Sequence, residues 1–342
     1  MRKCSLENAN ALFNKIAENS ALYIPVDIAP NKAKYVRFAD GMQMSNALKT
    51  ERSAKDFFFP QTQDLMEFKT EGKQIEIIDN RTEAEDFVIF GVRGCDAKSL
   101  EILDKVFLAE PVDTYYQNAR EHGLIISMAC DKPIETCFCQ TFGIDPSEPA
   151  GDIVCYKTAT DFIFDAKTEK GKSLLSKLDS VTCEGGEDEV NALKENIRMI
   201  LDKLPLKDLK ADAFGADKTD EYFNRPEWSQ LSEACLGCGT CTFVCPTCQC
   251  YDIKDYKTNK GVQRFRCWDS CMYSDFTLMA HGNSRNSQKE RFRQRFMHKL
   301  VYFPTNNDGM FSCVGCGRCV ARCPISMNIV KVMKTLGGKE NE

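Results

Sequence analysis

The chain has 342 residues, a formal net charge of −5 and 19 cysteines. This length is enough for two domains with separate hydrophobic cores, and the mixed charges lack the basic excess that is typical of nucleic-acid-binding proteins. The longest apolar runs, such as residues 87–90, have the length of a strand and not the ~20 residues of a membrane span. Abundant cysteine without an apolar leader after Met1 predicts a protein of a reducing, anaerobic cytoplasm, which meets a membrane only through a partner.

The first 80 or so residues predict a mixture of helix and strand. Ser5 as an N-cap, followed by apolar residues at near-helical spacing, predicts a helix over residues 5–19. Residues 55–60 carry three phenylalanines in a row and are interpreted as a core anchor, not as part of a site. The predicted strands cover residues 21–26, 34–38, 65–69 and 74–78, and the last two form a hairpin around Gly72.

From residue 87 the pattern changes to strand (87–90), helix (97–108) and strand (124–127), which predicts a βαβ unit with two parallel strands. Ligands bind at the carboxyl ends of such strands. The cysteines that follow these ends, and that form a candidate metal-ligand set, are Cys95, Cys130, Cys137 and Cys139. The alternative is that they are small buried hydrophobic residues, which is our interpretation of Cys4, Cys155 and Cys183.

The next segment carries few chemical signals and mainly sets domain boundaries. Its predicted elements are strands over residues 153–158 and 161–165, a short helix over 173–178, an acidic surface loop over 183–189, and helices over 190–204 and 209–214. We predict an N-terminal mixed α/β domain over residues 1–185, of the α/β or α+β class. A helical connector over residues 186–229 leads to a last domain over 230–342.

The last domain contains the pattern C-x2-C-x2-C-x3-C-P twice. This spacing is typical of proteins with two [4Fe-4S] clusters, in which the fourth cysteine of each motif binds the other cluster. The predicted ligand sets are Cys235, Cys238, Cys241 and Cys323 for the first cluster, and Cys313, Cys316, Cys319 and Cys245 for the second. Glycines between the cysteines permit the tight loops that such ligation needs. A zinc site or a disulfide framework fits this spacing less well.

The two motifs are separated by 67 residues, so the insert must have structure of its own. Phe292, Phe296 and Leu300 form an apolar helical stripe, and we therefore predict the α-helical type of two-cluster ferredoxin. The basic residues of this helix are Arg285, Lys289, Arg291, Arg293, Arg295 and Lys299. They form either a solvated face or a set of cations that stabilises reduced clusters or docks an acidic partner. Four further cysteines, Cys248, Cys250, Cys267 and Cys271, are interpreted as packing beside the clusters, with an additional cluster as the alternative.

Several local sequences together resemble one known family. They are Val92-Arg-Gly-Cys-Asp96, Cys130 with Cys137-Phe-Cys139, Cys245-Pro-Thr-Cys248, Trp268-Asp-Ser-Cys271, the basic helix ending at His298-Lys299, and Cys313-Val-Gly-Cys-Gly-Arg-Cys319. The chain is similar, nearly end to end, to the A subunit of anaerobic sulfite reductase and the β subunit of sulfhydrogenases. Because Cys95, Cys130, Cys137 and Cys139 all match, the resemblance implies a third [4Fe-4S] cluster. Cys267 lies outside the family pattern.

The resemblance implies an electron-transfer subunit of a multi-subunit oxidoreductase. Its expected partners are a flavin subunit that uses NAD(P)H, or a ferredoxin, and a catalytic reductase or hydrogenase subunit. The alternatives are an adapter of an electron-bifurcating, heterodisulfide-reductase-like complex, a reductase with its own substrate site in the N-terminal domain, and a redox sensor with structural clusters. With three histidines and no nucleotide-binding or nucleophile motif, the sequence predicts no catalytic residue.

Overall fold

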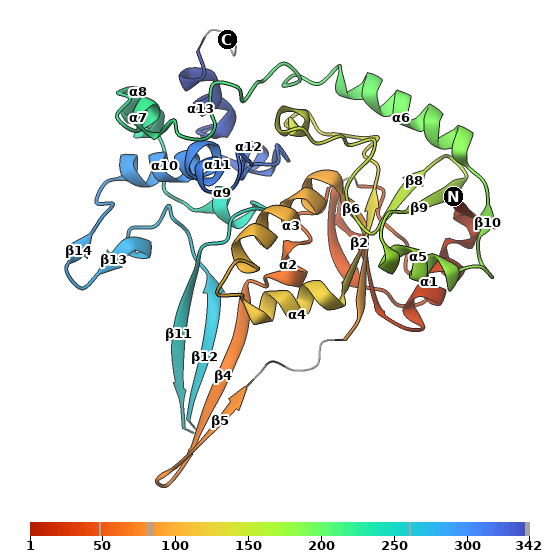
Figure 1. Cartoon of the computed structure of the whole chain (residues 1–342), viewed down its shortest axis with the longest axis horizontal. Coiled ribbons are helices and arrows are strands. Elements are labelled where there is room, and N and C mark those ends of the chain that lie inside the picture. Colours follow the sequence, from red (N-terminus) through yellow and green to blue (C-terminus); the bar gives the residue numbers. More distant parts are fainter. Residues whose placement is uncertain (48, 80, 82–84, 260, 339–342) are drawn as a thin grey trace.

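The structure is a computed structural model that describes residues 1–47, 49–79, 81, 85–259 and 261–338. Its largest element is an eight-stranded sheet with the order β10-β1-β9-β8-β7-β6-β2-β3 (Figure 1). The pairs β2–β6, β6–β7 and β7–β8 are parallel, and the outer pairs are antiparallel. The strands are β1 (Arg2–Ser5), β2 (Ala21–Ala29), β3 (Lys32–Arg37), β6 (Phe87–Arg93), β7 (Gly123–Met128), β8 (Ile153–Lys157), β9 (Asp161–Ala166) and β10 (Cys183–Glu184).

Successive residues of a strand point to opposite faces of the sheet. In this sheet both faces carry apolar side chains, and helices cover both of them. In β6, Phe90 is buried in one cluster with Phe13, whereas Ile89 is buried in another with Leu100. The helices around the sheet are α1 (Ala9–Ala17), α2 (Lys55–Phe58), α3 (Gly94–Phe107), α4 (Thr114–His122), α5 (Glu169–Ser176) and α6 (Glu187–Leu201), with 3₁₀ turns η1 (Leu6–Asn8) and η2 (Cys139–Phe142). The predicted mixed α/β part is confirmed, and so are the parallel strands β6 and β7 of its βαβ unit, although two helices, α3 and α4, and not one, connect them.

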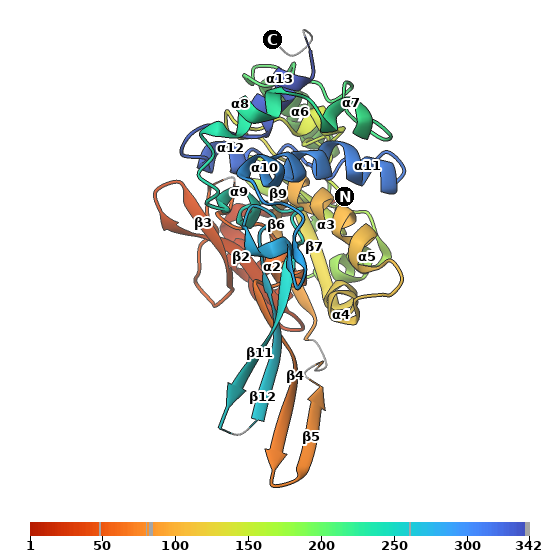
Figure 2. The same cartoon turned by 90° about the vertical axis from the view of Figure 1, so that its left-hand side faces the viewer.

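A second sheet forms an arm that extends from the body of the molecule (Figures 1 and 2). Its order is β11-β12-β4-β5, and all its pairs are antiparallel. The hairpin of β4 (Thr62–Glu71) and β5 (Gln74–Asp79) comes from the N-terminal half, and the hairpin of β11 (Tyr251–Thr258) and β12 (Gly261–Trp268) comes from the insert. The insert therefore begins as a β-hairpin, where the sequence predicted helical structure only.

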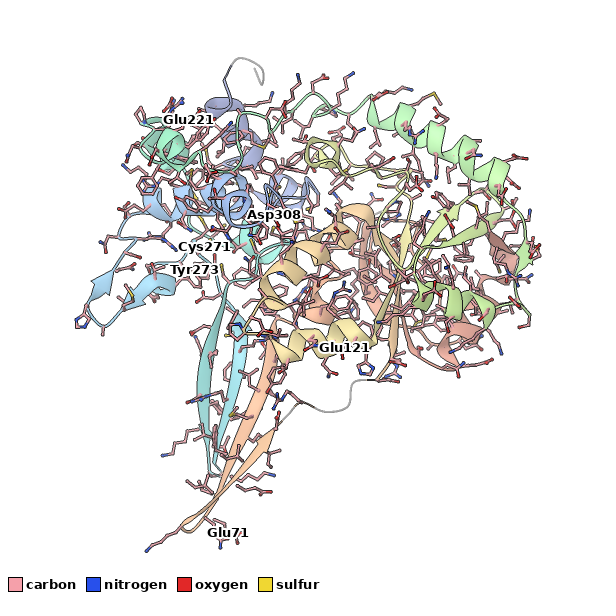
Figure 3. The ribbon with its side chains drawn as sticks, viewed as in Figure 1. Glu71, Glu121, Glu221, Cys271, Tyr273 and Asp308 are labelled. Atoms are coloured by element: carbon pink, nitrogen blue, oxygen red, sulfur yellow. The ribbon has the colours of Figure 1, made fainter. Side chains whose placement is uncertain are left out.

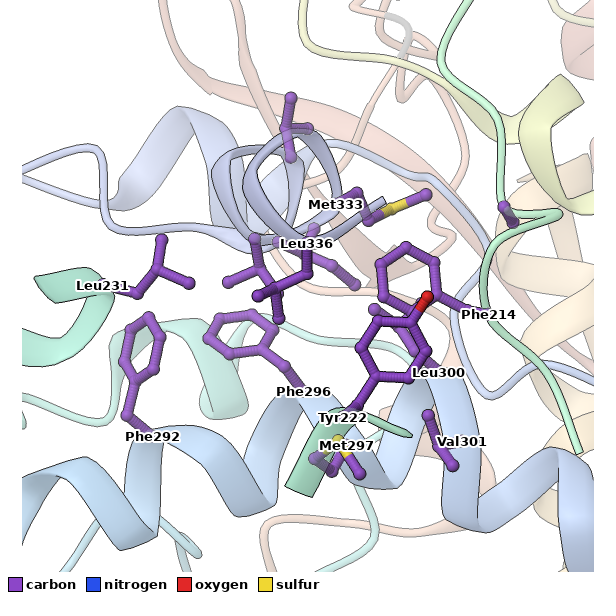
Figure 4. Close-up of a cluster of buried hydrophobic side chains, with 14 of the residues drawn as sticks. Phe214, Tyr222, Leu231, Phe292, Phe296, Met297, Leu300, Val301, Met333 and Leu336 are labelled. Carbon is purple, nitrogen blue, oxygen red and sulfur yellow. The ribbon is translucent and has the colours of Figure 1, made fainter. Parts of the chain in front are cut away.

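The C-terminal part is a group of helices around its own apolar core (Figure 4). The predicted stripe of Phe292, Phe296 and Leu300 is buried in this core, and Ser287 begins its helix with a capping box to Glu290. The helices are α7 (Thr219–Phe223), α8 (Glu227–Glu233), α9 (Thr240–Phe243), α10 (Gln288–Met297), the π-helical turn η4 (His298–Tyr302), α11 (Phe303–Asn306), α12 (Arg318–Arg322) and α13 (Ile329–Leu336). Shorter elements are η3 (Asp275–Thr277), β13 (Leu278–Met279) and β14 (Gly282–Asn283). Within the described residues, no helix is long and apolar enough to span a bilayer.

One predicted helix is shorter than expected, and another is wrong. The helix predicted over residues 5–19 is confirmed as α1 from Ala9 to Ala17, but residues 2–5 pair as strand β1 with β9 and β10, and residues 6–8 form a 3₁₀ turn. Residues 209–214 are irregular, although Leu209, Ala211 and Phe214 are all buried in the C-terminal core. In both places tertiary packing overrides the local helical pattern.

Candidate iron-sulfur sites

The two C-terminal motifs fold as matching loop and helix units. Residues 235–239 form a loop that leads into α9, and residues 313–317 form a loop that leads into α12. The two helices pack against each other. Gly239 (φ 72°) and Gly317 (φ 74°) precede these helices in the left-handed conformation, which residues with a side chain adopt only at a cost. Glycine therefore shapes both loops, as the spacing predicted.

Cys245 is the last cysteine of the first motif and lies near both motifs. Its thiol interacts electrostatically with those of Cys313, Cys316 and Cys319 in the second motif and with that of Cys241 in the first, and its Sγ lies 3.2 Å from Thr247 Oγ1. This placement agrees with crossed ligation, in which the fourth cysteine of one motif serves the other cluster. Cys323 ends α12, which packs on α9, and its role as the fourth ligand of the first cluster remains a prediction.

The structure also brings the four N-terminal cysteines together at one edge of the sheet. Cys95 lies in the first turn of α3 and Cys130 lies just beyond β7, so both follow the carboxyl ends of neighbouring parallel strands. The thiols of Cys130, Cys137 and Cys139 interact electrostatically with one another. Cys95 and Cys139 share one buried cluster. Three of the four thiols thus lie together, whereas the thiol that acts on Cys95 is that of Cys316 in the second motif. The role of the four cysteines as one ligand set stays a prediction.

The N-terminal set lies directly against the loop of the second motif. The backbone N–H of Phe138 donates to the carbonyl of Gly315 at 2.9 Å, and Thr136 Oγ1 donates to the carbonyl of Gly317 at 3.2 Å. A Cβ added to Gly315 would lie 2.3 Å from the oxygen of Phe138, far inside van der Waals contact. The two loops are therefore packed backbone to backbone, although they are far apart in sequence.

Of the four further cysteines of the insert, three lie beside the C-terminal motifs and one does not. The thiols of Cys245 and Cys248 influence each other's pKa, and so do those of Cys250 and Cys271. Cys267 lies on β12, where its electrostatic neighbours are Lys254, Asp252 and Asp269. The three expected buried hydrophobic cysteines divide differently: Cys4 and Cys155 are buried, but Cys183 is exposed because it lies on the short edge strand β10.

Three buried cations surround the turn from Cys245 to Cys248. Lys55, 2% exposed, donates to the carbonyl oxygens of Cys248 at 2.9 Å and Cys245 at 3.2 Å. Lys299, 3% exposed, donates to Thr247 Oγ1 at 2.8 Å and the Ser312 carbonyl at 3.0 Å. The third cation, Arg295, is 2% exposed and donates through Nη2 to the Cys241 carbonyl at 2.9 Å.

These cations test whether the site fits an iron-sulfur cluster. A buried cation is costly without a compensating anion, and within the described residues none of the three lies within 4.0 Å of a carboxylate. Two guanidinium nitrogens of Arg295, Nε and Nη1, have no hydrogen-bond partner at all in the described part of the chain. Apart from the neutral oxygens that accept their hydrogen bonds, the groups that act electrostatically to keep Arg295 and Lys299 charged are thiols. Anionic clusters held by those thiols would supply the missing negative charge, so the residues fit the cofactor.

The thiols themselves need a positive charge to ionise. Burial raises the pKa of Cys319 and of Cys139 to about 12, and that of Cys130 to about 11. Such thiols are neutral at physiological pH, and a coordinated metal reverses this by binding the thiolate. Among the described residues, no three His, Cys, Asp or Glu side chains converge as ligands of one metal ion. A cube separates its ligands more widely than a zinc ion does, so the cluster interpretation fits this arrangement better than a zinc site.

Sequence reasoning missed the cations that enter the sites from outside the motifs. Residues 55–60 were interpreted as a core anchor only; Phe58 and Phe59 are indeed fully buried, but Lys55 belongs to the site. In the basic helix, Lys289 is exposed as a solvated face predicts, whereas Arg295 and Lys299 point inward. The available signal was the helical phase, because Arg295 is adjacent to the apolar stripe that contains Phe292 and Phe296.

A buried ion pair fixes the second motif to the N-terminal domain. Arg318, inside the motif, forms a bidentate pair with Asp96, the residue after Cys95, and the Nη2–Oδ2 distance is 2.7 Å. The two side chains are 4% and 1% exposed. Arg318 also donates through Nε to the carbonyl of Thr50 at 3.3 Å. One guanidinium thus joins three segments that surround the second and N-terminal cysteine sets.

The first motif differs from the other sets in lying at the surface. Cys238 is exposed and Leu236 is 67% exposed, whereas Cys316, Cys137 and Cys139 are buried. Tyr273, labelled beside Cys271 in Figure 3, donates from its hydroxyl to the Cys238 carbonyl at 3.4 Å. The three cysteine sets therefore lead inward from an exposed loop, through the second motif, to the edge of the large sheet.

Comparison with known proteins gives one family model and one related protein. Residues 234–327 match the model of a 4Fe-4S dicluster domain. The chain is 32% identical over 324 residues to a protein of Pyrococcus furiosus named sulfhydrogenase 2 subunit beta, and the alignment covers 94% of this chain and 93% of that one. No solved structure matches. The matched dicluster segment contains all eight cysteines that the spacing assigns to the two C-terminal clusters.

Proposed function

The chain belongs to the sulfhydrogenase β-subunit family, and from this premise we propose that it relays single electrons between two partner proteins through three [4Fe-4S] sites. Family membership and the dicluster domain establish an iron-sulfur electron-transfer subunit. The route and the third site are our proposal. The observation that carries it is the contact between the loop of the second motif and the N-terminal cysteines, at Phe138 and Gly315.

Each bound cluster would accept and release one electron at a time, with a potential set by its ligands and surroundings. The protein supplies the ligands and the order of the sites. We assign Cys235, Cys238, Cys241 and Cys323 to the first site and Cys313, Cys316, Cys319 and Cys245 to the second. Cys95, Cys130, Cys137 and Cys139 form the third. The buried position of the second and third sites supports an internal path, because it keeps water and stray oxidants from the clusters.

The exposed loop of the first motif is the proposed point of entry or exit. Electron transfer becomes rapidly slower with distance, so a partner must approach a cluster closely. Leu236 and Cys238 offer such an approach at the first site. In the N-terminal set Cys130, which is partly exposed, marks the opposite end of the path. The partner that we propose here is a flavin subunit that uses NAD(P)H or a ferredoxin, and a catalytic reductase or hydrogenase subunit would complete a cytoplasmic complex at the other end.

Iron content tests the number of clusters. Anaerobically reconstituted protein should bind about twelve irons per chain if three [4Fe-4S] sites are present, and about eight if only the two C-terminal sites are. Cys95→Ala should lower the iron content by about four irons and remove one reducible component from the electron paramagnetic resonance (EPR) spectrum. Cys267→Ala, on β12 away from the other thiols, is the control and should bind as much iron as the parent. Full iron content in Cys95→Ala would exclude Cys95 from the ligands.

The docking role of the first loop is tested by Leu236→Glu. Because this side chain is 67% exposed, the substitution should leave folding and iron content unchanged. A charge in an apolar contact should, however, slow reduction by a donor protein about tenfold or more, since desolvating it costs free energy. Stopped-flow reduction by a donor protein, compared with reduction by dithionite, measures the effect. Met199→Glu, another exposed apolar site on α6, is the control, and equal rates for the two variants would refute this docking site.

A further inference from the structure

Two cations lie at the two junctions between neighbouring cysteine sets. Arg295 is the first, between the C-terminal motifs. It donates to the carbonyl of Cys241 in the first motif, and its charge also acts on Cys319 of the second motif and on Cys245. Because Nε and Nη1 have no partner among the described residues, most of the guanidinium is available to an anion that lies between the two motifs.

Lys49 occupies the other junction, between the second motif and the N-terminal set. Its Nζ lies 3.2 Å from the Sγ of Cys137 and also donates to the carbonyl of Cys316. Its electrostatic neighbours are Cys137, Cys316 and Cys95, in that order. Lys49, like Arg295, has no carboxylate within 4.0 Å in the part of the chain that the structure describes. The same arrangement, one buried cation that touches one cysteine set and acts electrostatically on a neighbouring set, therefore occurs twice.

Reduction of a cluster adds one negative charge to a buried site. A nearby cation stabilises the reduced form, so it raises the reduction potential, and the effect is strong where water does not screen it. A cation between two clusters raises both potentials together. Its removal therefore makes two potentials more negative and leaves a remote third one unchanged, whereas a cation beside one cluster would affect only that cluster.

Resting on the proposed function, we propose that Arg295 and Lys49 tune the clusters in adjacent pairs. Arg295 raises the potentials of the first and second sites, and Lys49 raises those of the second and N-terminal sites. The second site, which lies in the middle of the path, is raised by both. An electron is thereby favoured at the middle of the path, where it is buried, and it leaves when a partner accepts it.

The test is a redox titration of each cluster in the reconstituted full chain, followed by EPR, with iron content measured in parallel. The titration of Arg295→Gln is compared with the parent at the parent's midpoint potential, where half of each cluster is reduced. At that potential the ratio of reduced to oxidised cluster should fall about tenfold at the first and second sites, which for one electron corresponds to a midpoint potential that is 59 mV more negative. The N-terminal site should be unchanged. Lys49→Met should shift the second and N-terminal sites and spare the first, and Arg295→Lys should restore most of the parent behaviour.

Two control variants each remove a positive charge near the sites but keep both junction cations, Arg295 and Lys49. Arg293, on the same helix, stacks 3.6 Å from the ring centroid of Phe223, so Arg293→Gln should leave all potentials close to those of the parent. Lys132, in the loop between Cys130 and Cys137, is exposed, and Lys132→Met should likewise have little effect because water screens its charge.

The possible results separate the two levels of the proposal. Parent protein with no reducible clusters would overturn the proposed function itself. Full iron with unshifted potentials in both Arg295→Gln and Lys49→Met, or a uniform shift at all three sites, would overturn the pairwise tuning alone. If both Arg295→Gln and Arg295→Lys lose iron, Arg295 has a structural role, and tuning at the junction between the first and second sites is overturned. Tuning at the junction between the second and N-terminal sites is then decided by Lys49→Met.

Discussion

Asp96→Ala should destabilise the protein by about 3–5 kcal/mol, which is the usual cost of removing one partner of a buried ion pair. Asp96 is 1% exposed and pairs with Arg318, which is 4% exposed. Without the carboxylate, the guanidinium stays buried, and among the described residues the carbonyl of Thr50 is its one remaining hydrogen-bond acceptor. Because the pair joins α3 to the second motif, the N-terminal and second sites should lose iron before the first site does. Denaturant unfolding under anaerobic conditions and site-resolved EPR measure the two effects.

Two further variants show whether the effect comes from the buried charge. Glu85→Ala removes an ion pair with Arg37 whose side chains are each 60% exposed, and exposed pairs contribute little, so its stability should hardly change. The double variant Asp96→Ala/Arg318→Met removes the uncompensated charge and should recover much of the lost stability. An unfolding free energy as low in the double variant as in Asp96→Ala would show that shape, and not charge, accounts for the loss.

Local sequence patterns were enough to predict those elements whose structure depends on residues close together in the sequence. The βαβ unit was found from two signals. A buried parallel strand, such as residues 87–93, is a continuous run of apolar residues, and in the helix after it the apolar residues repeat with the helical period. The cysteine motifs were found because a cluster dictates the spacing of its ligands. The basic helix was found because its apolar stripe repeats every three to four residues.

Features that depend on long-range pairing could not be read in this way. The strand β12 joins β4 across about 200 residues, as in the pair Arg266–Gln63, and neither hairpin alone identifies its neighbour. Lys55, at the start of the short helix α2, and Lys49, in a loop, reach their sites from segments with no motif of their own. Asp96 and Arg318 each stand next to a predicted ligand, but nothing local indicates that they form a pair. These residues became recognisable only when the two halves of the chain were placed together.

Gly315→Ala should disrupt the second and N-terminal sites together. Gly315 has φ 56°, and an added Cβ would lie 2.3 Å from the oxygen of Phe138 and 2.7 Å from the Cα of Cys139. Backbone atoms cannot rotate away as a flexible side chain can, so the loop of residues 136–139 must separate from the second motif. We expect iron to be lost from both sites while the first site, whose loop over residues 235–239 does not include Gly315, keeps its cluster. Iron analysis and EPR of the reconstituted variant measure the outcome.

Gly309→Ala separates this steric effect from backbone strain. Gly309 also has a positive φ, 78°, but nothing lies within 4 Å of an added Cβ. Alanine there should cost only the left-handed strain of about 1–2 kcal/mol and leave all the iron in place. If Gly315→Ala retains as much iron as Gly309→Ala, or loses it from the first site alone, the two loops are not packed as tightly as the structure has them. The path from the second motif into the N-terminal domain would then have no physical basis, because this backbone contact is what brings the two cysteine sets close enough to exchange an electron.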